Sequence, residues 1–166
     1  NRPRLLSKSL HREGLLLDKT IFEVEISNSG PKSYETATVM KMPASFAEFS
    51  DALQKARIKD GSFCKNELTC IHYNGLTHAM IGWNANLYDL NLFAQRLASL
   101  TEEQKKGMDA LLKIKQNHRV APIPLNQLIN LTYNTDICCF APRVSNHEEL
   151  GAFLYANEML SNEAMA

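Results

Sequence analysis

Two cysteines and two histidines between positions 64 and 78 are the residues of this chain whose types and spacing best suit chemistry. Cys64, Cys70, His72 and His78 carry side chains that bind zinc in proteins. Cys70 and His72 are two residues apart on a predicted strand, so both should point to the same face of a sheet. No pair of closely spaced ligands accompanies them, however. We therefore prefer ordinary buried thiols and surface imidazoles over a structural zinc ion, because cysteine is among the most buried residue types.

The remaining cysteines, Cys138 and Cys139, are adjacent in the sequence. A redox pair normally has two residues between its thiols, so packing in the core is the preferred interpretation of this pair. The sequence has no phosphate-binding glycine loop, no nucleophile elbow and no His-Glu-x-x-His helix. A dispersed set of serine, histidine and aspartate can be drawn, but the sequence gives it no geometry. We expect a protein that is not an enzyme and that binds no metal or cofactor.

An antiparallel sheet is predicted in the first half of the chain. Four segments have the alternation or the β-branched content of strands, and they cover 21–26, 34–42, 68–73 and 76–82. Asn28 to Pro31 has turn chemistry, which makes a long hairpin of the first two strands. Asn74-Gly75 is a strong hairpin signal between the last two.

A helix between the second and third strands is predicted to begin at Ser45 and to end near Arg57. Ser45 and Glu48 form a capping box, in which each side chain bonds the backbone amide of the other residue. At 100° per residue the apolar positions share one face, and we expect them to pack on the sheet. They are Phe46, Phe49, Ala52, Leu53 and Ala56. The predicted order is therefore ββαββ.

The second half of the chain has helical periodicity. Predicted helices run from Asn84 or Asn86 to Leu100, from a capping box at Thr101 and Gln104 to Lys115, over 125–133, and onward from Asn146. The first of them has an apolar stripe of Leu87, Leu90, Phe93, Ala94 and Leu97. Tyr88 and Leu92 lie off this stripe, so either the helix is covered on two sides or these two residues form a contact surface. The last helix is expected to bury Leu150, Phe153 and Leu154.

These patterns predict an α+β protein, with an N-terminal antiparallel sheet that carries one packed helix, followed by a helical C-terminal half. We expect an arm at 1–19 and one domain at 20–166, sheet-rich over 20–83 and helical over 84–166. No apolar run approaches the ~18 residues of a membrane span, and the start of the chain lacks the apolar core of a signal peptide. We therefore predict a cytoplasmic protein without membrane contact.

The charges of the chain balance, with 18 basic and 18 acidic residues among 166. Whole-molecule electrostatics therefore favour neither a nucleic-acid binder nor an acidic mimic of DNA. The two ends differ, because residues 1–19 are mainly basic and the segment from Ser145 onward has glutamates but no lysine or arginine. Such ends could steer a partner or could simply be solvated.

Four segments of the chain, taken together, carry a family resemblance. In chain order they are MPASFAEFSDALQKARI from Met42, NLYDLNLFAQRLASLTEEQ from Asn86, LINLTYNTDICC from Leu128 and HEELGAFLYANEML from His147. These segments resemble ArdA-like antirestriction proteins of conjugative elements in gut Firmicutes. The similarity covers roughly Phe22 to Leu160 in order. Its shared positions are mostly apolar and structural, so they indicate kinship better than they indicate a site.

The resemblance implies a protein that is carried by a mobile element and protects incoming DNA from a host nuclease. The implied target is a restriction enzyme or a Cas9–guide RNA complex, bound directly and without catalysis. The best-known members of this family are elongated acidic dimers that imitate DNA, and a mimic needs a dense anionic row to displace phosphate contacts. This chain is neutral and offers only local clusters of charge. We therefore expect an inhibitor with a mixed contact surface.

The candidate partner contacts come from three places in the chain. They are Glu48, Asp51, Tyr88, Leu92, Glu148 and Glu149. A second function stays open, in which the chain is a nucleic-acid-binding accessory protein whose basic arm contacts phosphates. The residues of that arm are Arg2, Arg4, Lys8 and Arg12. A homodimer is also compatible with the sequence.

Overall fold

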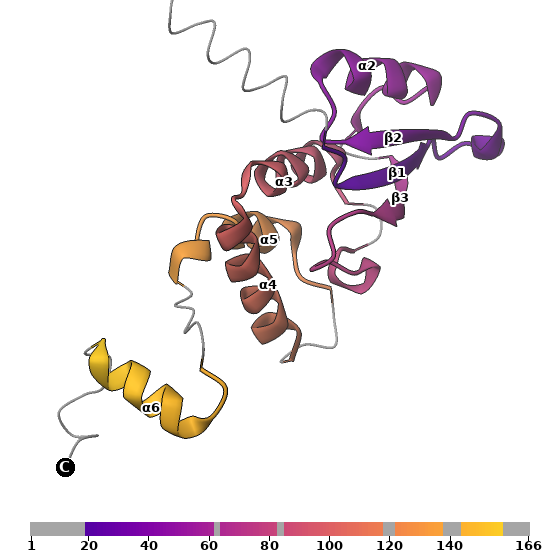
Figure 1. Ribbon diagram of the computed structural model, residues 1–166. Coiled ribbons are helices and arrows are strands. Elements are labelled where there is room, and N and C mark those ends of the chain that lie inside the picture. The colour runs from indigo at the N-terminus through magenta and orange to yellow at the C-terminus, as the bar shows by residue number, and fades with distance from the viewer. Residues whose placement is uncertain (1–18, 62–63, 83–84, 118–121, 138–143, 158–166) are drawn as a thin grey trace, which may run out of the picture.

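A three-stranded antiparallel sheet forms the N-terminal half of the molecule (Figure 1). The computed structural model describes residues 19–61, 64–82, 85–117, 122–137 and 144–157. Strand β1 (Phe22–Ser27) lies in the centre, between β2 (Thr38–Met42) and β3 (Lys65–Ile71). Helices make up most of the remaining described chain, which confirms the predicted α+β class. The predicted arm lies outside the described residues except for its last position.

The predicted fourth strand is wrong. The segment after Asn74-Gly75 forms a short 3-10 helix, η3 (His78–Met80), so the order of the described elements is ββαβ. Leu76, Met80 and Ile81 are buried, a spacing that does not alternate as a strand requires. The Met80 carbonyl accepts a hydrogen bond from the Ile123 amide at 3.0 Å. This segment therefore pairs with the connector before α5 (Leu125–Leu131).

The hairpin of β1 and β2 is shorter than predicted. Residues 33–35 form the 3-10 helix η1 (Ser33–Glu35), and β2 begins only at Thr38. Thr38 pairs with Ile26 at the end of the ladder. Tyr34, predicted to lie in the strand, is 74% exposed on η1.

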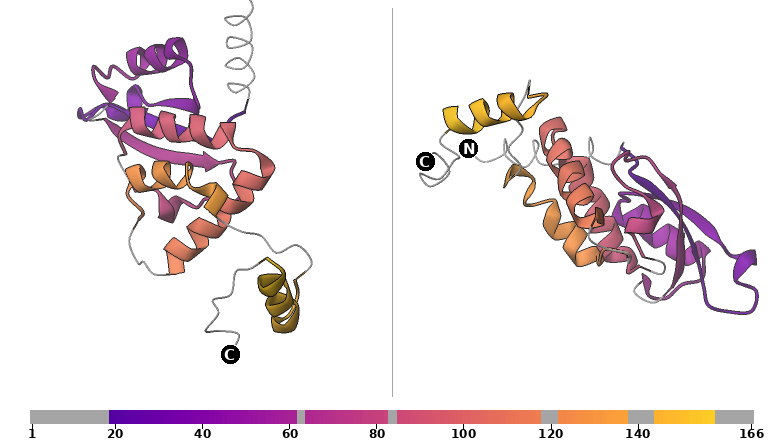
Figure 2. Two further views of the ribbon diagram at one scale, coloured as in Figure 1. Left: turned by 90° about the vertical axis from the view of Figure 1, so that its left-hand side faces the viewer. Right: turned by 90° about the horizontal axis from the view of Figure 1, so that it is seen from below.

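One face of the sheet carries the core. The buried apolar residues of this inner face are Phe22, Val24, Ile26, Met40, Met42 and Leu68. Phe22 stacks on Phe93 of helix α3 (Leu87–Ser99), with ring centroids 6.0 Å apart. Figure 2 shows α3 lying along this face, with α2 (Phe46–Lys55) beside it. The opposite, outer face is polar, and Glu25, Val39 and Glu67 on it are exposed.

A β-bulge in β3 decides which side chains reach the outer face. Glu23 is paired with Cys70 and Val24 with Leu68, so Thr69 is an extra residue on β3. The Thr69 hydroxyl donates to the Glu23 carbonyl at 3.2 Å. Because of this extra residue, Cys70 lies on the same outer face as Glu23, although Leu68 two positions earlier is buried.

The described helices begin largely where the sequence predicts. Asn86 caps α3 by accepting from the Tyr88 and Asp89 amides. Thr101 and Gln104 form the expected capping box at the start of α4 (Glu102–Asn117), at 3.1 and 3.2 Å. Helix α5 (Leu125–Leu131) is shorter than predicted, because the chain turns at Thr132. None of the helices in the described ranges is both long and apolar enough to cross a membrane.

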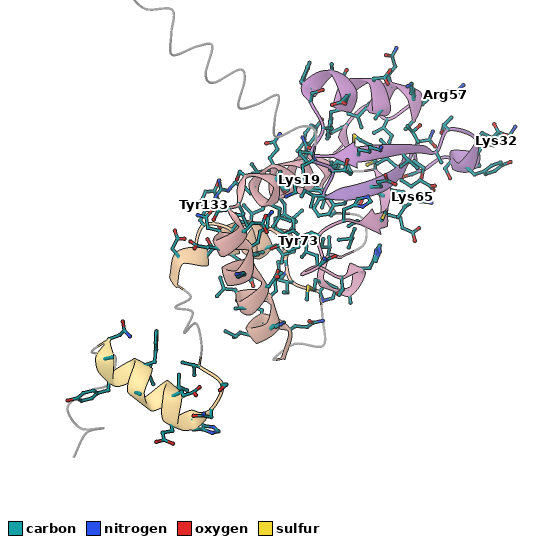
Figure 3. All side chains as sticks on the ribbon, viewed as in Figure 1. Lys19, Lys32, Arg57, Lys65, Tyr73 and Tyr133 are labelled. Carbon is teal, nitrogen blue, oxygen red and sulfur yellow. The ribbon has the colours of Figure 1, made fainter. Side chains whose placement is uncertain are left out.

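Two close contacts lie within the helical half, and a third joins that half to the sheet. Gly107 of α4 packs against the Thr135 backbone of η4 (Thr135–Ile137), where an added Cβ would lie 2.4 Å from the carbonyl oxygen. The Arg96 guanidinium lies 3.9 Å from the centre of the Tyr133 ring. Tyr73, just beyond β3, donates from its hydroxyl to the Lys105 carbonyl at 3.2 Å and lies between the sheet and α4 (Figure 3).

Helix α6 (His147–Ala156) lies apart from the sheet and from α3 to α5, as Figure 1 and the left view of Figure 2 show. Asn146 caps it by accepting from the Glu149 amide at 2.8 Å, as predicted. The predicted buried edge is wrong, because none of the ten residues of α6 is buried. Its apolar stripe includes Leu150, which is exposed, while Phe153 and Leu154 are half-buried.

Candidate functional site

The start of α2 is fixed by the predicted capping box. The Ser45 hydroxyl accepts from the Glu48 amide at 3.3 Å, and the Glu48 carboxylate accepts from the Ser45 amide at 2.8 Å and from its hydroxyl at 2.6 Å. These hydrogen bonds stabilise the charged carboxylate and lower the pKa of Glu48 below its usual value. The carboxylate is therefore already engaged within the helix that carries it.

An amide clamp ties the residue before the N-cap of α2 to α3. The Asn91 side chain accepts from the Ala44 amide at 2.7 Å and donates to the Ala44 carbonyl at 3.1 Å. Three residues earlier on α3, the Tyr88 ring stacks on Phe49 of α2, with ring centroids 5.0 Å apart. Two contacts on one flank of α3 thus hold the N-terminal half of α2 in place.

Three large apolar side chains are exposed where these helices meet. Phe46 is 90% exposed, Tyr88 is 48% exposed and Leu92 is 43% exposed. We call these three residues the α2–α3 junction. Aromatic residues of this kind are enriched among the side chains that dominate protein–protein binding energy. The junction is therefore one described surface whose side chains are of the kind that bind a protein.

Phe46 is a residue that sequence reasoning missed, because it was predicted to pack on the sheet. The other inward positions of α2 behave as predicted, with Phe49, Ala52 and Ala56 buried. At 100° per residue Phe46 lies about 90° from the centre of that stripe. A residue at the edge of a stripe is buried only where a neighbour covers that edge. The available signal was the position of Phe46 directly after the cap.

The predicted acidic contacts do not form one cluster. Asp51 is paired with Lys55 one turn later at 2.7 Å, and both side chains are exposed. Glu48 is also on α2, so the structure brings Glu48 and Asp51 onto the helix that neighbours Tyr88 and Leu92. The two remaining contacts belong to α6, which lies well away from α2 (Figure 1).

The glutamates of α6 are in a helix N-terminus rather than in a groove. Glu149 accepts from the Ser145 amide at 2.7 Å and from its hydroxyl at 2.8 Å, and these bonds lower the pKa of Glu149. Glu148 is exposed in the same turn. Arg2, Arg4, Lys8 and Arg12, the basic residues of the alternative prediction, lie outside the described residues.

The four zinc-like residues are not brought together. Cys64 is buried, its thiol donates to the Gly61 carbonyl at 3.7 Å, and burial raises its pKa. His78 lines a separate cavity. Only Cys70 and His72 meet, with 3.9 Å between Sγ and Nδ1, which confirms that they share a face. Within the described ranges, no three residues of metal-binding type are grouped so that they could hold an ion. Cys138 and Cys139 lie outside those ranges.

The cavity beside β3 has a volume of about 210 Å³ and is lined by residues of β3 and of the segment around η3. It is smaller than the roughly 300–1,000 Å³ of typical small-molecule sites. The Asn66 amide on its wall already donates to the Ala85 carbonyl at 2.6 Å. This bond joins β3 to the segment before α3, so the Asn66 side chain stabilises the fold.

Comparison of the chain with models of known protein families, with curated proteins and with solved structures found no match. The resemblance to antirestriction proteins therefore stays a prediction from the quoted segments. The α2–α3 junction is identified only from the contacts and exposed fractions described above.

Proposed function

We propose that this chain is an anti-defence protein of a mobile element, which inhibits a host DNA-targeting nuclease by binding it through the α2–α3 junction. The observation that carries the binding role is the 90% exposure of Phe46 on a helix whose N-terminal end is held against α3 through Ala44 and Phe49. A rigidly presented aromatic side chain loses little conformational freedom on binding, which favours affinity. The target class comes from the sequence resemblance alone.

The surroundings of the junction suit a mixed interface rather than a mimic of DNA. The outer side of α2 carries Asp51 and Lys55, whose opposite charges are paired. Protein interfaces commonly combine an apolar centre with a polar rim. A duplex mimic would instead need a continuous anionic row, because phosphate contacts dominate binding to DNA-reading proteins.

The experiment measures protection of a DNA substrate from cleavage by a Cas9–guide RNA complex and, separately, by a restriction enzyme. Phe46→Ala should weaken inhibition by about 30-fold, which corresponds to a binding hot spot of ~2 kcal/mol. Tyr34→Ala is the matched control, because Tyr34 is 74% exposed on η1 and lies outside the junction. Equal inhibition by the two folded variants would remove the junction from the proposal.

Charge reversal separates the acidic candidates. Asp51→Lys tests the rim of the junction and Glu148→Lys tests α6, and neither residue accepts a capping bond that an added positive charge would break. We expect Asp51→Lys to weaken inhibition and Glu148→Lys to leave it unchanged. If neither nuclease is inhibited by the wild-type protein, the target class itself is wrong.

A further inference from the structure

The outer face of the sheet holds a cysteine, a histidine and a glutamate in a row. Cys70 Sγ lies 3.9 Å from His72 Nδ1, and His72 Nε2 lies 3.8 Å from Glu23 Oε1. Cys70 and His72 come from β3 and the residue after it, and Glu23 comes from β1. The bulge at Thr69 creates this arrangement, because it turns Cys70 to the face on which Glu23 lies.

The row has the order of a proton relay. A neutral histidine that carries its proton on Nε2 keeps its Nδ1 free to accept a proton. In this tautomer Nδ1 faces the Cys70 thiol and the protonated Nε2 faces the Glu23 carboxylate. Nucleophilic cysteines are activated by an adjacent base that a third group orients, and such contacts are often longer than ordinary hydrogen bonds when no reactant is bound. Lys41 pairs with Glu23 across β1 and β2, so a basic residue stands opposite this carboxylate.

Exposure distinguishes Cys70 from the other described thiol. Cys70 is partly exposed on the outer face, whereas Cys64 is buried beneath Gly61. Reaction requires both a thiolate and access for the reagent. Only Cys70, of these two, has a neighbouring base and an open approach.

We propose that Cys70 is a nucleophilic thiol that forms a mixed disulfide with a low-molecular-weight disulfide such as glutathione disulfide. His72 Nδ1 takes the proton from Sγ, and the thiolate attacks one sulfur of the reagent. A new bond forms between Sγ and that sulfur, the disulfide bond of the reagent breaks, and the second half leaves as a thiolate that is reprotonated from His72. The oxidant is the reagent itself, so the exchange is balanced.

The test follows adduct formation at each cysteine by peptide mass spectrometry, after the full-length protein is incubated with glutathione disulfide. We expect Cys70 to react at least about tenfold faster than Cys64 in the native protein. His72→Gln should slow Cys70 by about tenfold, at the low end of the effect of a general base because the contact is long. His78→Gln is the matched control, because His78 is also an exposed histidine but lies away from Cys70 and should leave the rate unchanged.

Repeating the measurement in denaturing urea tests the proposal even if a variant folds poorly. The rates of Cys64 and Cys70 should converge there, because both the burial of one and the relay of the other depend on the fold. A Cys70 rate that stays higher in urea, or that is unchanged by His72→Gln in the native protein, would overturn the proposal.

Discussion

Replacing Asn91 by alanine should loosen the start of α2 and reduce the stability of the whole protein. The clamp makes two hydrogen bonds to the backbone of Ala44, which is 2% exposed. Each bond contributes about 1 kcal/mol net, and leaving a buried amide and carbonyl without these partners adds a further penalty. We therefore expect a loss of about 2–3 kcal/mol. For a chain of this size that corresponds to a fall in Tm of roughly 5–10 °C.

A graded variant makes the reasoning sharper. Asn91→Asp can still accept from the Ala44 amide but, when ionised, cannot donate to its carbonyl. Its free energy of unfolding should fall between those of the wild type and Asn91→Ala. Gln95→Ala, on the exposed part of the same flank of α3, is the control and should change stability by less than about 0.5 kcal/mol. Urea unfolding of the four proteins provides the comparison. Equal stability of Asn91→Ala and Gln95→Ala would refute the view that the clamp holds α2.

Three further substitutions test a close contact, its control and a helix cap. Gly107→Ala should destabilise the protein by about 1–2 kcal/mol in thermal unfolding, because overpacking against the η4 backbone exceeds the gain of up to ~1 kcal/mol in helix propensity. Gly151→Ala has open space around its added methyl group and should not lower Tm. Ser45→Ala should cost about 1 kcal/mol near pH 7 through loss of the cap. The folded pKa of Glu48 is lowered, so its contribution is present above its unfolded pKa and is lost as the pH falls through the folded value. The Tm difference between wild type and Ser45→Ala should accordingly shrink below about pH 4.

Local signals in the sequence predicted the elements whose ends are set by neighbouring residues. The caps at Ser45 and Thr101 lie where the sequence indicated, and Asn86 is one of the two caps predicted for α3, because a cap depends on residues three positions apart. The core stripe of α3 was likewise predicted in full, since every one of its positions is buried. Periodicity over thirteen residues leaves little ambiguity about the face that points inward.

The errors fall where distant contacts decide. Asn74-Gly75 resembles a hairpin turn. Tyr73, the residue before it, turns inward to reach α4, so the chain leaves the direction of β3 before this turn. The exposure of Phe46 and of Leu150 depends on whether another element covers one side of a helix, which no local pattern records. Of the proposed relay, the sequence indicated only that Cys70 and His72 share a face. Glu23 joins them through strand pairing with a residue 47 positions away.

Thr69 shifts the alternation of side chains along β3 between the two faces of the sheet. Residues before it alternate in one phase between core and solvent, and residues after it alternate in the other. If β3 kept Thr69 but paired without the bulge, Thr69 would stand opposite Glu23 and Cys70 opposite Phe22, on the core side of the sheet. Deleting Thr69 would instead remove the bulge and leave Cys70 opposite Glu23, with Ile71 still packed against the core. The place of the thiol on the outer face therefore depends on how the strand is paired as much as on the identity of its side chains.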